Sequence, residues 1–367
     1  RLALILALGA LVGFVLWRFS PGIGLAVTLA ASGALVAVYA FAWRHGWVVP
    51  LGAPLVAVLG LYGLNTAWGF FAEARAKRQI TRLFGQYVPP ELADEMARDP
   101  ARYSLAGQSR DMSVLFSDIR GFTDFSEKLP PAELAEVLNA YLSTMTRIVQ
   151  EQRGTIDKYI GDAIMAFWNA PVDMPDHASR AVDTALAMQA ALPRLNEEFA
   201  ARGWPHVKIG VGVNTGRMSV GNMGSVFRMS YTVMGDAVNL GSRLEGITKQ
   251  YGVGVLATQT TVDADPVHAY LKIDEVRVKG KEVPVAIFEP VGRRTELTTA
   301  QRQMIAGFDA ACAAYQGQRW DEAEAALDAL EAAEARPLYA LYRERVAHFR
   351  GNPPPPDWNG VFVYTTK

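Results

Sequence analysis

Two aspartates near the middle of this 367-residue chain have the surroundings of a metal and phosphate site. Asp118 ends an apolar stretch that starts at Met112, and the turn after it contains Gly121, which lets backbone N–H groups approach an anion. Asp162 follows Gly161 between two apolar stretches, as at a hairpin tip. Either aspartate alone is equally consistent with an ordinary turn. If their strands are neighbours, however, the carboxylates converge and need a cation between them, which predicts Mg²⁺ or Mn²⁺ bound with substrate phosphates.

A third block places an amide and a guanidinium on one helix. Residues 231–245 contain a strand, a Gly-Asp helix start and a helix with Asn239 and Arg243 four positions apart, hence on one face. Such a pair can offer a hydrogen bond and a fixed positive charge to a phosphoryl group in transfer. An ion pair between Arg243 and Glu245, or another surface acid, is the alternative. A later basic turn contains Lys279, which either meets terminal phosphates or is simply solvated.

The elements that position these residues alternate between strands and helices from residue 110 to about residue 291. Strands are predicted at 112–117, on both sides of the Gly161-Asp162 turn within 155–168, at 207–213, at 218–233 with a glycine-rich tip, and near 253–257, 271–278 and 283–291. Helices are predicted at 131–153, 176–202 and 236–251. This mixed order predicts an α+β fold with helices on a largely antiparallel sheet.

Residues 1–72 are far more apolar than the rest and predict three transmembrane helices, within 2–17, 22–43 and 48–71. Each stretch approaches or exceeds the roughly 17 to 25 residues that a span needs. The basic segment that follows predicts, by the positive-inside rule, that everything downstream is cytoplasmic. A buried helical bundle in a soluble protein is the alternative.

The segments that flank the α+β domain have their own patterns. A cytoplasmic helical linker is predicted over residues 73–104, with a break at 84–90. Residues 293–352 form an alanine-rich helical tail that resembles one or two tetratricopeptide-like helices, and it should pack on the domain or on a partner because one such unit cannot bury its own face. Residues 353–367 are a proline-rich, extended C-terminus.

Charge and cysteine content exclude several classes of protein. The 36 basic and 37 acidic residues give a formal net charge of -1, so nothing indicates binding to nucleic acid. The only cysteine, Cys312, excludes an intrachain disulfide and lies in a run of alanines typical of a buried structural thiol. Because the first residue is Arg1 rather than Met, the numbering is expected to begin inside a longer protein.

Together these blocks resemble the class III nucleotidyl cyclases over residues 105–292. The resemblance implies a cyclase homology domain with a ferredoxin-like core that works as a head-to-tail dimer, with sites formed across the interface. It also implies a role for each residue: Asp118 and Asp162 bind two metal ions, Asn239 and Arg243 stabilise the transition state, Lys279 binds the triphosphate, and the backbone of Ile119, Gly121, Phe122 and Thr123 forms the phosphate loop.

Two further positions match those that select the base in this family. Lys158 and Thr232 follow the pattern of adenylate cyclases, which have lysine with Asp or Thr, whereas guanylate cyclases usually have Glu and Cys. ATP is therefore the expected substrate, and GTP is the alternative. Threonine at this position is also similar to a subgroup that responds to bicarbonate, which makes bicarbonate a possible effector.

The resemblance implies conversion of ATP to 3′,5′-cyclic AMP and pyrophosphate, with two Mg²⁺ or Mn²⁺ ions per site. Since one chain carries both sets of residues, a homodimer would hold two complete sites. The spans and linker resemble bacterial cyclases with an upstream CHASE-type sensor, which predicts a multi-pass protein of the bacterial inner membrane. A catalytically silent receptor that uses the cyclase fold for dimerisation is the non-enzymatic alternative.

Overall fold

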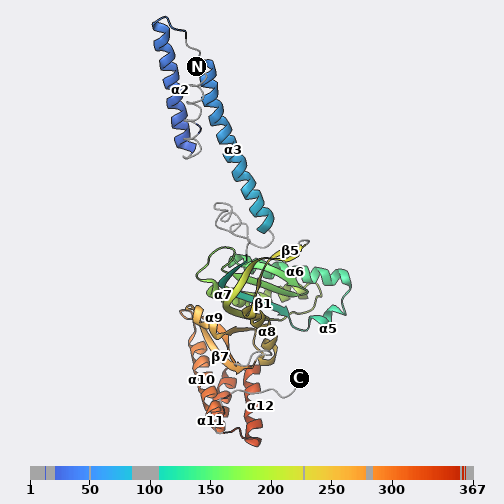
Figure 1. Cartoon of the computed structure of the whole chain (residues 1–367). Helices are drawn as coiled ribbons and strands as arrows, with labels where there is room; N and C mark the ends of the chain where they lie inside the picture. The colour runs from blue at the N-terminus through green and yellow to red at the C-terminus, as the bar shows by residue number, and fades with distance from the viewer. Residues whose placement is uncertain are drawn as a thin grey trace. The chain divides into compact units, whose positions relative to one another are not determined.

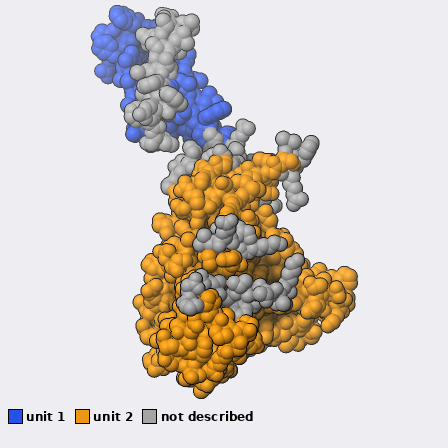
Figure 2. All heavy atoms as spheres, turned by 60° about the horizontal axis from the view of Figure 1, so that its bottom comes forward, with its two compact units in different colours: residues 1–83 blue, residues 84–367 orange. Residues whose placement is uncertain are grey.

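The computed structural model describes residues 13, 21–48, 51–84, 107–225, 228–277, 284–355, 358 and 360. The chain divides into two compact units, residues 1–83 and residues 84–367, coloured blue and orange in Figure 2. The predicted boundaries within the second unit stay predictions.

The first unit contains two long apolar helices, α2 (Pro21–Arg44) and α3 (Gly52–Phe84). They pack through Val58, which is buried against Ala31 and Leu35, while most of their large apolar side chains are exposed. Among the described residues two helical segments, not three, are long and apolar enough to cross a membrane: Gly22–Arg44 and Gly52–Phe71. The predicted first span, 2–17, lies outside the described residues except for Gly13.

Helix α3 continues past its apolar part as far as Phe84. The start of the predicted linker is therefore helical, because no proline or glycine interrupts residues 73–84. The predicted break at 84–90 and the rest of the linker lie beyond Phe84, outside the described residues.

The second unit is built on an eight-stranded sheet (Figure 1). Seven strands follow the order β2-β3-β1-β4-β6-β8-β7, and β5 pairs with β4. All neighbouring strands are antiparallel except β4 and β6, which confirms the prediction of a largely antiparallel sheet. The bounds are β1 Gln108–Ile119, β2 Thr155–Ile160, β3 Ala163–Trp168, β4 Ile209–Ser225, β5 Arg228–Met234, β6 Val255–Thr258, β7 His268–Val276 and β8 Val285–Arg293.

Helices cover both faces of the central strands. Their bounds are α5 Phe122–Ser126, α6 Pro131–Glu151, α7 His177–Ala200, α8 Asp236–Tyr251 and α9 Gln259–Ala264. Because successive side chains of a strand point to opposite faces, Leu115 of β1 packs in the core with α6 and α7, whereas Val114 and Phe116 meet α8. The order β1-α6-β2-β3-α7-β4, with β1 between β3 and β4, is that of the predicted ferredoxin-like core.

Two glycines bring α8 unusually close to the sheet. A Cβ on Gly212 of β4 would lie 2.5 Å from the backbone N of Glu245, and one on Gly241 of α8 would lie 2.9 Å from Cγ1 of Val114. A larger side chain at either position would force the helix away from the strands. The close backbone contact therefore fixes the distance between the sheet and α8, the helix that carries Asn239 and Arg243.

One predicted element differs from the structure. The sequence predicts one strand before Asn214, at 207–213, and another after it, from residue 218. In the structure a single strand, β4, runs without a break from Ile209 to Ser225. Asn214, Thr215 and Gly216 pair with β1 in regular antiparallel register, and Asn214 Nδ2 donates to the Ala237 carbonyl oxygen at 2.6 Å. These three residues can continue the strand because the neighbouring strand and helix satisfy their polar groups.

The tail contains three helices rather than one or two, α10 (Thr299–Gln316), α11 (Trp320–Ala333) and α12 (Pro337–Gly351). It packs on the α+β domain, which is the first of the two predicted options. Tyr342 donates from its hydroxyl to the Ile273 carbonyl oxygen at 2.6 Å, and Arg345 forms a buried ion pair with Asp274 at 2.7 Å. The tetratricopeptide-like assignment stays a prediction.

The sole cysteine lies on α10, the first helix of this tail. Cys312 is half-buried and packs against the cluster formed by the tail and α8. Burial raises the pKa of its thiol to about 12. The thiol is therefore protonated at neutral pH, which agrees with a structural role.

A buried charge cluster joins α7 to β7. His268 is fully buried, with Nδ1 at 2.7 Å from Asp265 Oδ2 and Nε2 at 3.1 Å from Asp183 Oδ1. Burial opposes the charged ring, but the hydrogen bonds and charges of the two carboxylates outweigh it and raise the His268 pKa from 6.5 to about 9. The imidazolium therefore ties two elements that are distant in sequence.

Replacement of His268 should cost more stability at neutral pH than in alkali. A folded-state pKa above the unfolded value stabilises the protein fully below about pH 6.5, and this stabilisation is lost as pH rises through about 9. For a shift of this size it is on the order of 3 kcal/mol. Thermal unfolding of the full chain in detergent should show a larger midpoint difference between wild type and His268→Gln at pH 6.5 than at pH 10. An equal difference at both pH values would contradict this assignment.

Candidate active site

The two predicted metal-binding aspartates lie together. Strand β3 pairs antiparallel with β1, with Ser117 opposite Ile164, so the β2-β3 turn that carries Asp162 reaches the end of β1. The backbone N–H of Ile119 donates to both carboxylates, at 3.1 Å to Asp118 Oδ1 and 3.1 Å to Asp162 Oδ2. The predicted convergence is therefore present within one chain.

The electrostatics of this pair suit a cation. Burial, the hydrogen bond to Asp162 and the charges of Asp162 and Glu245 together raise the pKa of Asp118 to about 7. No group of three or more His, Cys, Asp or Glu side chains able to hold a metal occurs among the described residues. Mg²⁺ characteristically uses one or two carboxylates and completes its shell with water and phosphate oxygens, so two crowded carboxylates are a fitting donor set.

The predicted phosphate loop follows directly. Gly121 has φ +72° and is the N-cap of α5, so it turns the chain sharply from β1 into the helix. This left-handed conformation strongly favours glycine. The turn places Phe122 and Thr123 at the first positions of α5, immediately after the strand that carries Asp118. Backbone N–H groups at a helix start have no partner within the helix and are available to an anion.

The two predicted base-selecting residues meet at a third residue that the sequence analysis missed. Thr232 of β5 donates from Oγ1 to Asp157 Oδ2 at 2.5 Å, and Lys158 Nζ lies 3.1 Å from Asp157 Oδ1. The register between β2 and β3 shifts between Ile156 and Lys158, which leaves Asp157 as the extra residue of a bulge. The chain spacing of 75 residues between Asp157 and Thr232 offers no local signal for this contact.

The predicted transition-state pair lies on the exposed side of α8. Asn239 and Arg243 are both exposed, and within the described ranges their side chains form no hydrogen bond or ion pair. The alternative pairing of Arg243 with Glu245 is therefore absent from this part of the chain. Glu245 instead interacts electrostatically with Arg120, on the side of the metal-binding pair.

The helix start before Asn239 is anchored by side chains from the sheet. Asn214 Nδ2 donates to the Ala237 carbonyl oxygen, while Thr258 Oγ1 donates to Asn214 Oδ1 at 2.6 Å. Asn214 thus holds the first turn of α8 in place, although it falls between the strands predicted at 207–213 and 218–233. Lys279, the predicted triphosphate ligand, lies outside the described residues.

Those predicted site residues that the structure describes fall into sets that are not bonded to one another. In the part of the chain that the structure describes, no hydrogen bond or ion pair joins the Asp118 and Asp162 carboxylates to Lys158, Thr232 or the exposed face of α8.

Residues 105–289 match the family described as the adenylate and guanylate cyclase catalytic domain, which is half of the chain. The chain belongs to this family. It is 40% identical over 192 residues to an adenylate cyclase of Anabaena cylindrica, covering 50% of this chain and 37% of that protein. It is 35% identical over 210 residues to adenylate cyclase 1 of Rhizobium meliloti, covering 57% of this chain and 32% of that protein.

The cyclase domain also resembles solved structures. The adenylyl cyclase CyaB from P. aeruginosa superposes with a TM-score of 0.50 and 37% identity, over 53% of this chain and 100% of that chain. The chain spans about a third of the length of the two curated relatives above, which are therefore much longer proteins.

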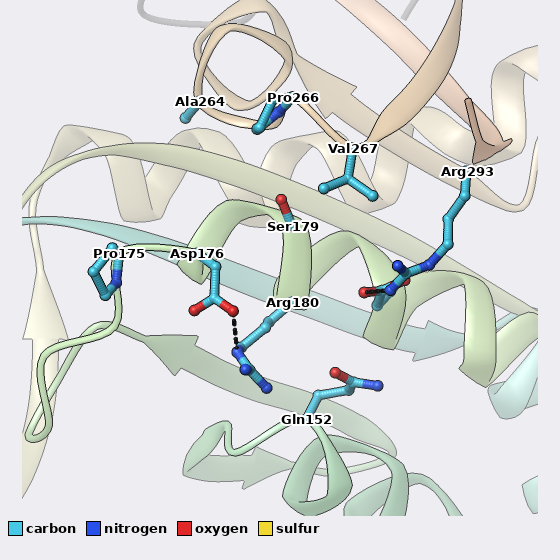
Figure 3. Close-up of a pocket in the computed structure, with 10 residues that line it drawn as sticks. Gln152, Pro175, Asp176, Ser179, Arg180, Ala264, Pro266, Val267 and Arg293 are labelled. Atoms are coloured by element: carbon cyan, nitrogen blue, oxygen red, sulfur yellow. Dashed lines mark hydrogen bonds and ion pairs between the residues drawn. The ribbon is translucent and has the colours of Figure 1, made fainter. Parts of the chain in front are cut away.

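A pocket of about 410 Å³ lies away from the predicted site residues of the cyclase domain (Figure 3). It is bordered by the start of α7, the loop after α9 and the end of β8, and Arg180 pairs there with Asp176 at 2.8 Å. None of the residues predicted for metal, phosphate or base binding lines it.

Asp118→Asn should stabilise the metal-free protein and remove its response to metal. The amide relieves the repulsion at Asp162, so the unfolding midpoint in EDTA should rise by roughly 2 to 4 °C, the shift expected for about 1 kcal/mol. Saturating Mn²⁺ should raise the wild-type midpoint but not that of the variant, measured by thermal unfolding of the full chain in detergent. Asp124→Asn, an exposed carboxylate of α5, is the control and should behave as wild type. Equal stabilisation of Asp118→Asn by Mn²⁺ would refute the metal assignment.

Proposed function

We propose that this protein is an adenylate cyclase that converts ATP to 3′,5′-cyclic AMP and pyrophosphate at a homodimer interface. The proposal rests above all on the convergence of Asp118 and Asp162 on one backbone N–H, in a chain that also keeps Asn239 and Arg243. The two curated relatives named as adenylate cyclases support the same activity. A silent receptor is disfavoured because the metal-binding pair and the transition-state pair are both present.

The proposed roles follow from the chemistry of each group. Asp118 and Asp162 hold two Mg²⁺ or Mn²⁺ ions, which supply Lewis acidity at the attacking ribose 3′ oxygen and charge neutralisation at the triphosphate. The first turn of α5 binds phosphate oxygens through backbone N–H groups. Arg243 offers a permanent positive charge to the pentavalent phosphate, and Asn239 orients the ribose by hydrogen bonding. Lys279 completes the triphosphate contacts.

A second copy of the chain is the proposed partner that completes each site. Outside α2, α3 and the connection between them, the large apolar side chains that the described residues expose are Tyr159, Ile160, Met229 and Met234. All four lie on β2 and β5, the strands that carry Lys158 and Thr232. An exposed apolar patch beside half of a site supports its burial by another copy, which would bring in the missing half.

The proposed location is the bacterial inner membrane, with the catalytic domain in the cytoplasm. The two apolar helices α2 and α3 support membrane association, and the basic residues after Phe71 support this orientation. A third span, an upstream sensor and stimulation by bicarbonate stay predictions.

The purified full chain in detergent should produce cyclic AMP from ATP when Mn²⁺ or Mg²⁺ is supplied. Product identification by mass spectrometry and parallel assays with GTP test both the reaction and its substrate. Arg243→Ala should lower kcat by roughly 100-fold or more, because it removes a charge that acts in the transition state. Formation of cyclic GMP alone would replace the proposal with the guanylate cyclase alternative, and no product from either nucleotide would refute the enzyme.

Mixed dimers should recover activity that neither parent variant has. Asp118→Ala and Arg243→Ala each damage both sites of a homodimer, but a heterodimer of the two keeps one intact site and should regain about half of the wild-type rate. Co-expression with two affinity tags isolates the heterodimer. A heterodimer between Asp118→Ala and Asp162→Ala is the matched control and should stay inactive, because each of its two sites contains a damaged metal-binding pair. Equal inactivity of both heterodimers would contradict a shared site.

A further inference from the structure

Asp157 is a buried carboxylate at the centre of the predicted base-binding residues. Its side chain is fully buried, and Oδ2 accepts two hydrogen bonds from β5, from Thr232 Oγ1 at 2.5 Å and from the Val233 backbone N–H at 3.2 Å. Its other oxygen, Oδ1, lies 3.1 Å from Lys158 Nζ. Because the side chain is buried, Asp157 can influence a bound base only through Thr232 and Lys158.

The contact from Thr232 has a direct consequence for recognition. A threonine hydroxyl has one hydrogen and can either donate or accept, so a free hydroxyl pairs with an amino group or with a carbonyl group equally well. The hydrogen of Thr232 is already donated to Asp157. The oxygen of Thr232 can therefore only accept, while the ammonium of Lys158 can only donate.

Adenine and guanine present opposite patterns to such a pair. Adenine has a donor at its 6-amino group and an acceptor at N1, whereas guanine has an acceptor at its 6-oxo group and a donor at N1. One fixed acceptor beside one fixed donor matches only one of the two purines in a given orientation. A hydroxyl that was free to rotate would remove the mismatch with the 6-oxo group of guanine, and only the mismatch between Lys158 and the N1–H of guanine would remain.

We propose that Asp157 is a positioning residue that sets purine selectivity by holding the Thr232 hydroxyl as an obligatory acceptor beside Lys158. This inference rests on the proposed function, in which these two residues contact the base. It adds a buried residue that has no contact with the nucleotide but fixes one of the two polar groups by which the pair distinguishes the purines.

Asp157→Leu tests the proposal because leucine is similar in size and cannot accept the hydroxyl hydrogen. The ratio of kcat/KM for ATP to that for GTP should fall by roughly 10- to 100-fold, as expected when a site loses a fixed polar mismatch against the wrong base. The fall in this ratio should arise mainly because GTP is turned over faster, or bound more tightly, relative to ATP. An unchanged ratio in this variant would overturn the proposal.

Asp157→Asn supplies the conservative rescue. The Val233 N–H requires an acceptor at the position of Oδ2, so the amide oxygen should occupy that place and still receive the Thr232 hydrogen. The ATP to GTP ratio should stay within a few-fold of wild type. Thr232→Val should lose selectivity, and the double variant Asp157→Leu with Thr232→Val should lose no more, because Asp157 acts through the missing hydroxyl.

Asp274→Asn is the matched control for loss of a buried carboxylate. Asp274 also accepts a hydroxyl hydrogen, from Tyr251 at 2.5 Å, but it lies at the contact with the helical tail. This variant should lower thermal stability without changing the ratio of the two nucleotides. A shift in the ratio equal to that of Asp157→Leu would show that destabilisation alone produces the effect, which would overturn the proposal.

Wild-type protein provides a test that needs no variant to fold. Inosine triphosphate has the 6-oxo and N1–H pattern of guanine without the 2-amino group, so it should be discriminated to the same degree as GTP. Equal use of inosine triphosphate and ATP would overturn the proposal. If wild type prefers GTP, the proposed substrate is wrong, and Asp157→Leu should then raise the ATP to GTP ratio, because the variant loses selectivity in either case. If neither nucleotide turns over, equilibrium binding of ATP and GTP supplies the same ratio.

Discussion

The antiparallel pairing of β1 with β3 is the constraint on which the candidate site depends. It places the β2-β3 turn beside the end of β1, so that Asp118 and Asp162 share the N–H of Ile119. Burial and the neighbouring carboxylate of Asp162 raise the pKa of Asp118. The repulsion between the two carboxylates destabilises the metal-free protein, and a bound divalent cation would relieve it. Metal binding should therefore raise the free energy of unfolding.

The position of α8 is set by a second kind of constraint, close contact between backbones. Gly212 and Gly241 let the helix lie directly on β4 and β1, and Asn214 fixes its first turn. With its inner face held in this way, the outer face presents Asn239 and Arg243 to solvent. The side chains with the least internal contact are thus carried by a rigid element, which suits groups that act only when substrate and a second copy arrive.

The tail packs on the second unit at β7, through Tyr342 and Arg345. Arg345 and Asp274 form a pair that is almost completely buried, and the Tyr251 hydroxyl also donates to Asp274. A buried ion pair of this type adds little net stability, but loss of one partner leaves an uncompensated charge. Tyr251 is the last residue of α8, the helix that carries Arg243. Because Tyr251 and Arg345 of the tail both bond to Asp274, the tail contacts the end of this helix.

The sequence alone was sufficient to predict the long helices and the antiparallel character of the sheet, and it also singled out Asp118, Asp162, Asn239 and Arg243, whose catalytic roles stay predictions. Those signals are local: strand alternation, a glycine before an acid, and an i, i+4 spacing on one helix face. The continuity of β4, the third tail helix and the buried partners Asp157 and Arg345 became evident only in the tertiary structure. The continuity of β4 and the two buried partners depend on hydrogen bonds between segments far apart in the chain. Asn214 stays within β4 because the neighbouring strand and helix satisfy its polar groups. Local chemistry thus determined which residues could react, whereas long-range packing decided how their protons and charges are held.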